Sequence, residues 1–278
     1  MRLDELRRWA AGQLDGFDSP QTEAWAVLEA NGITRTRVLS HPEEEADMAV
    51  LSSVRQMVGE RKKHVPLSYI THHKEFFALD FIVSGGTLIP RPDTEILVEK
   101  VIELARGRRG LTVLDLCTGT GCVGLALQTV LDVKHLVLAD ISPEALEVAR
   151  QNAARLAVTE VEIIQSDLFS AIREDLRFDI IVSNPPYIAH KWEAGLSEEV
   201  RKEPRLALFD EEEDGTGILK SIIASSFHRL EQNGILALEC DFRQAGTLIC
   251  ALTEAGYSQA GITKDLAGLD RVVSALRI

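Results

Sequence analysis

An asparagine, two prolines and a tyrosine occupy residues 184–187, directly after Phe178–Ser183, an apolar run typical of a buried strand. Proline has no backbone N–H and fixes φ, so this segment is stiff and leaves carbonyl oxygens free to accept hydrogen bonds. The sequence therefore predicts a tip that holds a planar NH2 group between two acceptors, the Asn184 side chain and the Pro185 carbonyl, with Tyr187 packing on its flat face. The alternative is a Pro-Pro pair that only ends a strand and begins a loop.

A glycine-rich turn lies upstream of this tip. It contains Gly119, Gly121 and Gly124 in GxGxxG spacing, and Asp140 follows at the end of the next predicted strand. Such glycines let a ligand approach the backbone, and the carboxylate can accept hydrogen bonds from both ribose hydroxyls. The turn thus predicts a nucleoside cofactor, the alternative being a tight strand-to-helix turn with no ligand.

Two further carboxylates favour S-adenosylmethionine over a nicotinamide dinucleotide. Asp115 lies on the strand side of the turn, where it would repel a pyrophosphate but suits a sulfonium and an amino group. Asp167 ends the third predicted strand, placed to accept the adenine amino group while Leu168 covers the base; a helix N-cap is its alternative role. The predicted cofactor-binding residues are Asp115, Cys117, Thr118, Gly119, Thr120, Gly121, Asp140, Asp167, Leu168 and Asn184.

The elements that must position these residues alternate between strand and helix from residue 112 onward, which predicts an α/β fold with a doubly wound sheet. Residues 257–263 and 271–278 predict a terminal antiparallel pair. The other predicted strands are 112–116, 135–140, 161–165, 178–184 and 234–240, and the predicted helices are 122–131, one capped by Ser142, and 216–230.

The first part of the chain has helical character. Its patterns predict one helix from Leu3 to Leu14, a second from Ser19-Pro20 to Asn31, and a longer third from His41 to Lys63 with acidic residues in its first turn. A β-hairpin linker and a helix from about Asp93 follow. The predicted domains are residues 1–74, a helical docking domain, residues 75–90, the hairpin linker, and residues 91–278, the catalytic domain.

Composition narrows the class of protein. The chain has 278 residues, 45% hydrophobic and 26% charged, with a net charge of −13 that argues against a broad phosphate-binding surface and favours a basic protein partner. It has no apolar run of membrane-spanning length and no signal-peptide core. Its four cysteines lack CxxC spacing and a histidine cluster, so we expect reduced thiols in a cytoplasmic protein without a metal site.

With these residues identified, the chain resembles the class I S-adenosylmethionine methyltransferases, and within them the PrmC/HemK family. That family methylates the glutamine of the Gly-Gly-Gln loop in class-I peptide chain release factors. The resemblance covers nearly the whole chain, and its most specific segment is Ile89-Pro90-Arg91-Pro92-Asp93-Thr94-Glu95. The other matching segments are the Asp115–Gly121 loop, Asp140, Gln165-Ser166-Asp167, Ile181–Ile188 and Glu203–Leu208.

The resemblance implies a Rossmann-like seven-stranded sheet, a small N-terminal helical domain that helps to dock the release factor, and a monomer. It implies that Asn184, Pro185 and Tyr187 are catalytic, and that these three bind the substrate together with Pro186 and Arg91. An ordinary surface salt bridge is the alternative for Arg91. Cys117 stands where the family loop usually begins with glycine, and could tighten the cofactor pocket.

Other functions remain as alternatives. A nucleic-acid methyltransferase would grip the NH2 group of adenine or guanine with the same tip, but the charge of −13 and the lack of a basic, aromatic-rich segment argue against it. A non-catalytic cofactor-binding module that docks on the translation machinery is a second alternative, and the intact tip argues against that. A nicotinamide oxidoreductase is a more distant one.

Overall fold

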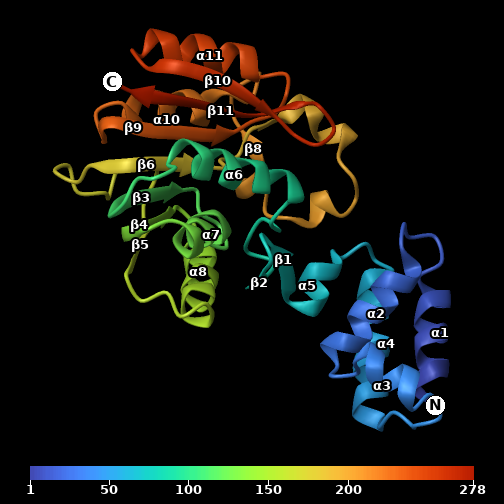
Figure 1. The fold of residues 1–278 in the computed structure, drawn as a ribbon. Helices are drawn as coiled ribbons and strands as arrows, with labels where there is room; N and C mark the ends of the chain where they lie inside the picture. Colours follow the sequence, from blue (N-terminus) through green and yellow to red (C-terminus); the bar gives the residue numbers. More distant parts are fainter. The chain divides into compact units, whose positions relative to one another are not determined.

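The computed structural model describes all 278 residues and divides them into two compact units (Figure 1). The first, called here the helical unit, consists of Met1–His73 together with Ser197–Lys202. The second, called the sheet unit, consists of Lys74–Leu196 and Glu203–Ile278. No helix in the chain is both long and apolar enough to cross a membrane.

The helices of the helical unit pack around a small core, which is formed by the apolar side chains on their inward faces. In α1, Leu3, Leu6 and Ala10 recur at helical spacing and are buried, as an amphipathic helix requires. The second helix begins with Pro20 as its first residue and ends before Asn31, as predicted. The helices are α1 (Leu3–Gln13), α2 (Pro20–Ala30), α3 (Arg35–Ser40), α4 (Met48–Arg61), α5 (Leu67–Thr71) and the 3-10 turn η3 (Val200–Lys202).

The third predicted helix, His41 to Lys63, is wrong at its start. The side chain of Asp47 accepts a hydrogen bond from the Val50 N–H at 2.8 Å, so it caps α4 and sets its first residue at Met48. The acidic residues that precede this cap lie outside any helix: Glu43 is in a turn, and the carbonyl of Glu44 accepts from the Leu3 N–H at 2.8 Å. The short helix α3 was not predicted.

Arg61, at the end of α4, holds the helical unit together through a buried ion cluster. Its guanidinium donates to both carboxylate oxygens of Glu23 on α2, at 2.6 and 3.0 Å, and to Glu199 at 2.6 Å. The Arg61 side chain is 4% exposed. Glu199 lies in the Ser197–Lys202 segment, so this cluster joins that segment to helices nearly 140 residues earlier in the chain.

The sheet unit is built on a seven-stranded sheet with the order β10-β11-β9-β6-β3-β4-β5. The five strands from β9 to β5 run parallel, and β11 pairs antiparallel with both β9 and β10. The doubly wound seven-stranded fold and the terminal antiparallel pair are thereby confirmed. The strands are β3 (Leu111–Leu116), β4 (Val133–Asp140), β5 (Val161–Gln165), β6 (Phe178–Ser183), β9 (Leu230–Glu239), β10 (Ser258–Lys264) and β11 (Asp270–Arg277).

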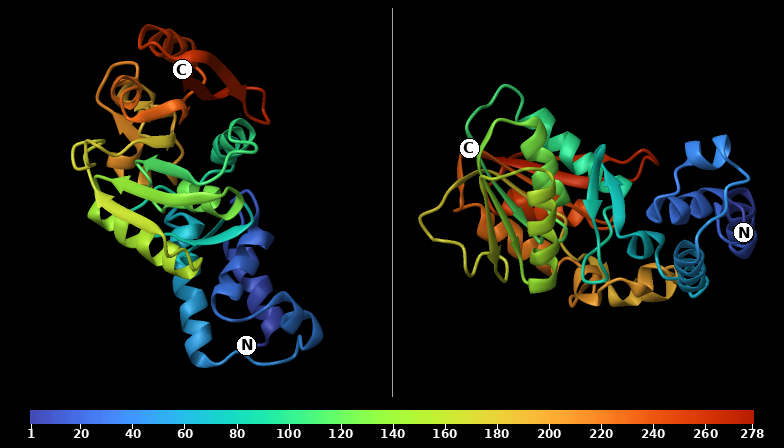
Figure 2. Two further views of the ribbon diagram at one scale, coloured as in Figure 1. Left: turned by 60° about the vertical axis from the view of Figure 1, so that its left-hand side comes forward. Right: turned by 90° about the horizontal axis from the view of Figure 1, so that it is seen from below.

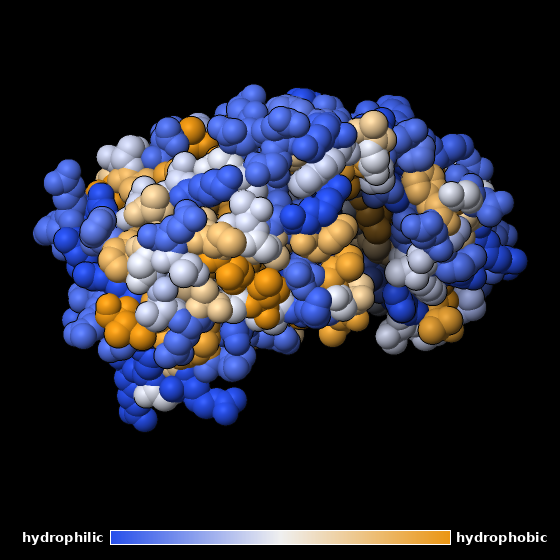
Figure 3. Space-filling model, turned by 90° about the horizontal axis from the view of Figure 1, so that it is seen from above, coloured by the Kyte–Doolittle hydropathy of each residue, from blue (hydrophilic) through white to orange (hydrophobic).

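Helices cover both faces of this sheet (Figures 1 and 2). One face packs against α6, α7 and α8, and the other against α10 and α11, each through its own cluster of buried apolar side chains. Because both faces are buried, the parallel strands are almost continuously apolar. The helices are α6 (Glu95–Leu104), α7 (Cys122–Val130), α8 (Pro143–Arg155), α10 (Gly217–Ser226) and α11 (Ala245–Glu254). On the face shown in Figure 3, hydrophobic residues are interspersed with hydrophilic ones.

A two-stranded sheet precedes α6. It turns at Phe77 and Ala78, both of which have positive φ, and packs Phe76 and Phe81 into the core beneath α6. The remaining elements are β1 (His73–Phe76), β2 (Leu79–Ile82), η1 (Pro92–Thr94), β7 (Ile188–Ala189), η2 (His190–Gly195), α9 (Arg205–Leu208) and β8 (Phe209–Asp210).

Candidate functional site

The glycine-rich turn lies at the carboxyl edge of the parallel strands, between β3 and α7. Cys117, Gly119 and Gly121 all have positive φ, at 55°, 55° and 81°. This conformation costs an L-residue roughly 1–2 kcal/mol and costs glycine nothing, which explains why a glycine is expected at position 117. Cys117 nevertheless adopts this left-handed conformation.

Asp115, at the end of β3, is the buried carboxylate of this turn. One of its oxygens accepts hydrogen bonds from the Thr118 hydroxyl at 2.6 Å and the Gly124 N–H at 2.9 Å. A side chain at Gly124 would lie 3.1 Å from the Asp115 carboxylate and 2.5 Å from Leu138, so only glycine allows this approach. Burial raises the pKa of Asp115 to about 7, against the lowering effect of these two hydrogen bonds.

Asp140 ends the neighbouring strand β4 and faces the same turn. Its two oxygens accept hydrogen bonds from the Gly119 N–H at 2.8 Å and the Ser142 N–H at 2.9 Å. Burial raises the pKa of Asp140, and these backbone donors oppose the shift. Each carboxylate oxygen has a second lone pair, so Asp140 can hold the turn and still accept hydrogen bonds from a ligand.

Two cavities meet at this edge of the sheet. The first, about 800 Å³ with the open space at its mouth included, is bordered by the turn and by the tip that follows β6. The second, about 1060 Å³ counted in the same way, extends past the end of β5. Both are lined by Cys117, Asp140 and Pro186, so a ligand that lies along this edge would span them.

The cavity linings bring together most of the predicted site residues. Those that border the first are Asp115, Cys117, Thr118, Gly119, Thr120, Asp140, Asn184 and Pro186. Those that border the second are Cys117, Asp140, Asp167, Leu168 and Pro186. Four others lie outside both linings: Gly121, Pro185, Tyr187 and Arg91. Gly121 is the residue before α7, and a side chain there would lie 3.0 Å from Leu125 and 3.3 Å from Leu138.

The segment after β5 places Asp167 at the rim of the second cavity, where it is exposed. No helix begins there, since the chain reaches β6 without one, so the structure gives Asp167 no helix to cap. Leu168 has a φ of 47°, and its carbonyl accepts a hydrogen bond from the Ser166 hydroxyl at 2.7 Å. These contacts fix a tight turn that presents both side chains to the cavity.

The tip at residues 184–187 follows β6 directly. The Asn184 Nδ2 donates a hydrogen bond to the hydroxyl of Thr94 at 3.2 Å. The Oδ1 atom of the same amide takes no part in this bond. Asn184 borders the first cavity, whereas Pro185 is buried and lies outside both linings. Of the predicted pair of acceptors, the structure places Asn184 at the cavity, and the role of the Pro185 carbonyl stays a prediction.

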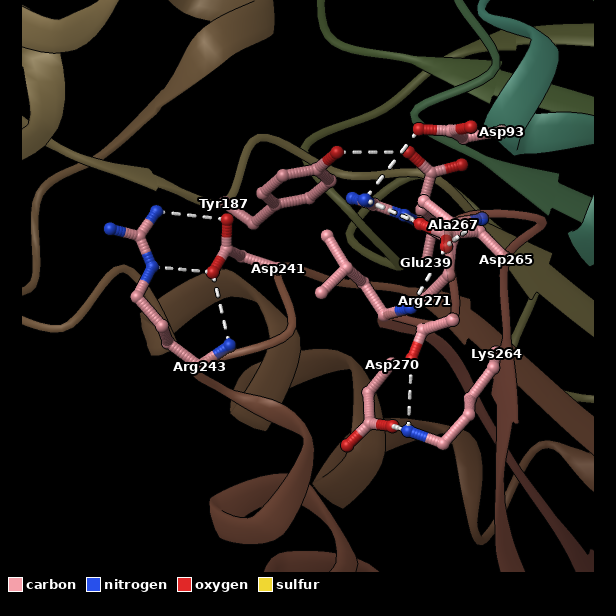
Figure 4. A network of polar contacts seen from close by, with 12 residues as sticks. Asp93, Tyr187, Glu239, Asp241, Arg243, Lys264, Asp265, Ala267, Asp270 and Arg271 are labelled. Carbon is pink, nitrogen blue, oxygen red and sulfur yellow. Dashed lines mark hydrogen bonds and ion pairs between the residues drawn. The ribbon is translucent and has the colours of Figure 1, made fainter.

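Tyr187 is fixed at both its ring and its backbone. Its hydroxyl donates to Glu239 Oε1 at 2.9 Å (Figure 4), and its carbonyl accepts from Gln244 Nε2 at 2.8 Å. Burial, followed by the negative charge of Glu239, raises the pKa of the phenol well above its usual value, so it remains a hydrogen-bond donor. A side chain at Gly215 would lie 2.3 Å from the same carbonyl, so the loop over Tyr187 requires glycine.

Glu239 is a buried carboxylate at the end of β9, with 1% of its surface exposed. Burial raises its pKa, while hydrogen bonds from Thr94 and Tyr187 and the charge of Arg271 favour the ionised form. Arg271 on β11 donates to Asp265 at 2.9 Å and lies 3.5 Å from Asp93 (Figure 4). The positive charge of Arg271 thus partly neutralises the negative charges of Glu239, Asp265 and Asp93.

Arg91 is paired with a buried partner. Its guanidinium donates to one carboxylate oxygen of Glu203, and the other accepts the Ile89 N–H at 3.0 Å. The Glu203 side chain is 1% exposed and that of Arg91 is 34% exposed. This pair joins the two family-like segments around residues 91 and 203, and it is more buried than an ordinary surface salt bridge.

Sequence reasoning missed the supporting roles of Glu239, Gln244 and Gly215. Gln244 binds three backbone carbonyls at once, those of Tyr187, Asp214 and Gly215, at 2.8 to 2.9 Å. A signal for Glu239 was present, since an acidic residue is the last residue of β9, as it is of β4, and the second-last residue of β3 is also acidic. No group of three or more histidine, cysteine or acidic side chains is placed to hold a metal ion.

Known proteins share both the sequence and the fold of this chain. The family model described as PrmC N-terminal domain matches residues 5–71, and the one described as Methyltransferase small domain matches residues 92–205. A release factor glutamine methyltransferase from Moorella thermoacetica is 38% identical over 278 residues, covering 99% of this chain and 96% of that protein. A protein of the same name from Leptospira interrogans is 40% identical over 230 residues, covering 81% of this chain and 80% of its own.

Among solved structures, a methyltransferase from Pyrococcus furiosus has a TM-score of 0.56 and 17% identity, covering 81% of this chain and 98% of that one. At that level of identity the likeness is one of fold.

Proposed function

Because the chain belongs to the release factor glutamine methyltransferase family, we propose that it methylates the side-chain amide nitrogen of the glutamine in the Gly-Gly-Gln loop of class-I peptide chain release factors, with S-adenosylmethionine as the methyl donor. The observation that carries this proposal is the orientation of Asn184. Its Nδ2 is bound to Thr94, so Oδ1 is the acceptor available to a substrate NH2 group.

The residues at the sheet edge fit S-adenosylmethionine. Asp115, a buried carboxylate, suits the amino group and sulfonium; Asp140 suits the ribose hydroxyls, and Asp167 with Leu168 suits the adenine. The remaining residues proposed to hold the cofactor are Cys117, Thr118, Gly119, Thr120, Gly121 and Asn184. When bound, S-adenosylmethionine supplies an electrophilic methyl group on a positively charged sulfur.

The tip would prepare the substrate nitrogen. An amide nitrogen is a poor nucleophile because its lone pair is delocalised into the carbonyl. Asn184 Oδ1 and the Pro185 carbonyl would accept hydrogen bonds from the two N–H groups of the substrate amide. This would direct the lone pair of the amide nitrogen toward the cavity that the turn borders. Fixed positioning of this kind can supply roughly 7–11 kcal/mol of a barrier. No strong general base is needed, because the methylated nitrogen is acidic and loses its proton late.

Substrate binding would involve the residues beside the acceptors of the tip, Tyr187 and Pro186. Tyr187, anchored by Glu239, packs against the glutamine side chain, and Pro186 borders both cavities beside it. Arg91, held by Glu203, would order the segment that leads from the β1–β2 hairpin to α6. The helical unit would help to dock the release factor. We infer a monomer in the cytoplasm, and the charge of −13 disfavours nucleic acid as a partner.

The test is methyl transfer from labelled S-adenosylmethionine to a purified class-I release factor. A variant factor with Gln→Ala in its Gly-Gly-Gln loop serves as the matched control, with total RNA and DNA assayed in parallel. We expect label on the wild-type factor alone. Label on nucleic acid would show that the same site methylates the amino group of a base. No label on any substrate would favour a cofactor-binding module without catalytic activity.

A further inference from the structure

We propose that Leu206, on the short helix α9, is a further cofactor-binding residue, which covers the middle of S-adenosylmethionine where the ribose adjoins the sulfonium. This role rests on the proposed function for its ligand. The cofactor-binding residues named above all lie near the carboxyl end of a parallel strand. Leu206 comes instead from the loop between β7 and β8, so it would bind the cofactor from a separate part of the fold.

Leu206 differs from the other exposed apolar residues of the chain. It is 59% exposed, and single exposed leucines are ordinary on a protein surface. Among the exposed large hydrophobic residues, however, only Leu206 and Ile141 border the two cavities at the sheet edge, and each of them borders both. An apolar side chain that is open to water beside a cavity is stabilised when a ligand covers it.

The chain holds α9 in place on both sides of Leu206. Before it, the buried carboxylate of Glu203 accepts a hydrogen bond from the Ile89 N–H at 3.0 Å. After it, Phe209 in β8 pairs with Ile188 in β7, the strand that directly follows the tip. Leu206 therefore lies between two anchored points, and the cavities are bordered by a side chain whose backbone is fixed.

The side chains of α9 are sorted by the spacing of a helix. Leu206 and Leu208 lie on different sides of it; Leu208 is 5% exposed and packs inward, whereas Leu206 borders the cavities. Arg205 borders neither cavity, because its guanidinium binds Glu193 and lies 4.5 Å from the centre of the Phe209 ring. The helix thus presents an apolar group, and no cation, to a ligand that carries a positive sulfur.

The residues shared by the two cavities locate the contact along the cofactor. Asp115 borders only the first cavity and Asp167 only the second, so the amino-acid end and the adenine end would occupy different cavities. Asp140, which suits the ribose, borders both, and so does Leu206. Leu206 would therefore lie over the ribose and the adjoining sulfonium. An apolar cover there excludes water and so strengthens the attraction between Asp115 and the positive charge of the cofactor.

The first experiment measures whether the cofactor covers residue 206. A Leu206→Cys variant also carries Cys250→Ser, because Cys250 is the native cysteine that is exposed. Alkylation of the introduced thiol by iodoacetamide is followed by peptide mass spectrometry with and without S-adenosylmethionine. With the cofactor at about ten times its Kd, roughly one molecule in eleven is free, so we expect the rate to fall about tenfold.

The matched control is Leu266→Cys in the same background. Leu266 is 99% exposed and borders neither cavity, so the cofactor should leave the alkylation rate at this position unchanged.

The second experiment measures cofactor affinity by titration calorimetry. Leu206→Ala removes most of the apolar cover, and we expect the Kd for S-adenosylmethionine to rise roughly tenfold. Leu206→Met keeps an apolar side chain of similar volume and should stay within roughly twofold of wild type. Leu266→Ala should keep the wild-type Kd. Because Leu206 is exposed, Leu206→Ala should also keep the wild-type Tm, which separates a contact with the ligand from a structural role.

The two proposals can fail separately. If the cofactor protects residue 206 but the release factor stays unmodified, the proposed function is wrong and the contact with Leu206 stands. If the introduced thiol is not protected, or Leu206→Ala keeps the wild-type Kd, the contact is wrong even where the wild type methylates the factor. A higher KM for the release factor with an unchanged cofactor Kd would also overturn it, because Leu206 would then contact the protein substrate.

Discussion

The amide of Asn184 provides an acceptor that alanine lacks, while most of the cavity around it is built by other residues. We expect Asn184→Ala to lower kcat by roughly 100-fold or more, the typical loss when one preorganised polar group at a reacting centre is removed. The Kd for S-adenosylmethionine, measured by titration calorimetry, should change little. A kcat close to that of the wild type in this variant would remove Asn184 from the mechanism.

Asp115 predicts a pH-dependent cofactor affinity. Burial raises its pKa to about 7, so the carboxylate gains its charge as the pH rises through neutrality. The charged form attracts the cofactor's ammonium and sulfonium, and affinity should therefore increase with pH. Between about pH 6 and about pH 7.5 the ionised fraction grows roughly eightfold, and we expect Kd to fall by a similar factor.

Calorimetry at the two pH values tests this expectation, with Asp115→Asn as the control. Asparagine cannot ionise, so affinity in that variant should be low at both pH values. Asp140 also has a raised pKa, and a pH dependence that persists unchanged in Asp115→Asn would assign the effect to Asp140 instead.

At the scale of the elements, the loop at Gly215 holds the tip in place from outside. Gly215 has a φ of 70°, and an added Cβ would lie 2.3 Å from the Tyr187 carbonyl. We expect Gly215→Ala to lower the free energy of unfolding by about 1–3 kcal/mol and to reduce kcat by displacing the tip. Chemical denaturation and the methylation assay measure the two effects.

Gly246, in α11, is the matched control. It has no positive φ, and an added Cβ would meet nothing within 4 Å. Gly246→Ala should leave kcat unchanged and raise the free energy of unfolding by about 0.5–1 kcal/mol, since alanine favours a helix. Equal effects of the two substitutions would show that the contact with Tyr187 is unimportant.

The sheet and the ends of its strands were predictable because the relevant signals are local. Apolar runs mark the buried strands, and the residues that follow them fall at one edge, which is how Asp115, Asp140 and Asn184 were found together. The error at His41 has the same origin: three acidic residues resemble a first helical turn, but hydrogen bonds to the N-terminal backbone take precedence, and Asp47 is the true cap.

The supporting contacts were not predictable, because each joins residues far apart in the sequence. Gln244 reaches Tyr187 across 57 residues, Glu239 reaches it across 52, and Arg91 reaches Glu203 across 112. The pattern of residues in a single sequence does not indicate which distant residues will be in contact. They depend on the order of strands in the sheet and on the loops above it, which only the folded chain defines.

At the scale of the whole molecule, each unit has a core of its own and the proposed chemistry lies in the sheet unit. Damage to the helical unit should therefore separate docking from cofactor binding. In Arg61→Met, Glu23 and Glu199 lose a buried cation, and we expect α2 and α4 to be destabilised by about 3–5 kcal/mol. Native-state hydrogen exchange of α4 amides measures this loss.

The same variant should keep its affinity for S-adenosylmethionine but lose kcat/KM for the release factor. Lys62→Met is the control, because Lys62 is exposed and binds only the Gln13 side chain at 3.1 Å. It should resemble wild type in all three measurements. A fall in cofactor affinity in Arg61→Met would contradict the separation of the two roles.

The helical unit is encoded by two separate stretches of the gene, because Ser197–Lys202 belongs to it together with Met1–His73. The chain passes from one unit to the other three times, after His73, Leu196 and Lys202. A genetic crossover at the first junction would exchange Arg61 but leave Glu199 to the other parent. Where the parents differ in Ser197–Lys202, recombination at this one boundary separates Arg61 from the segment that its own gene supplies. The two parts of the gene that encode the helical unit should therefore vary together.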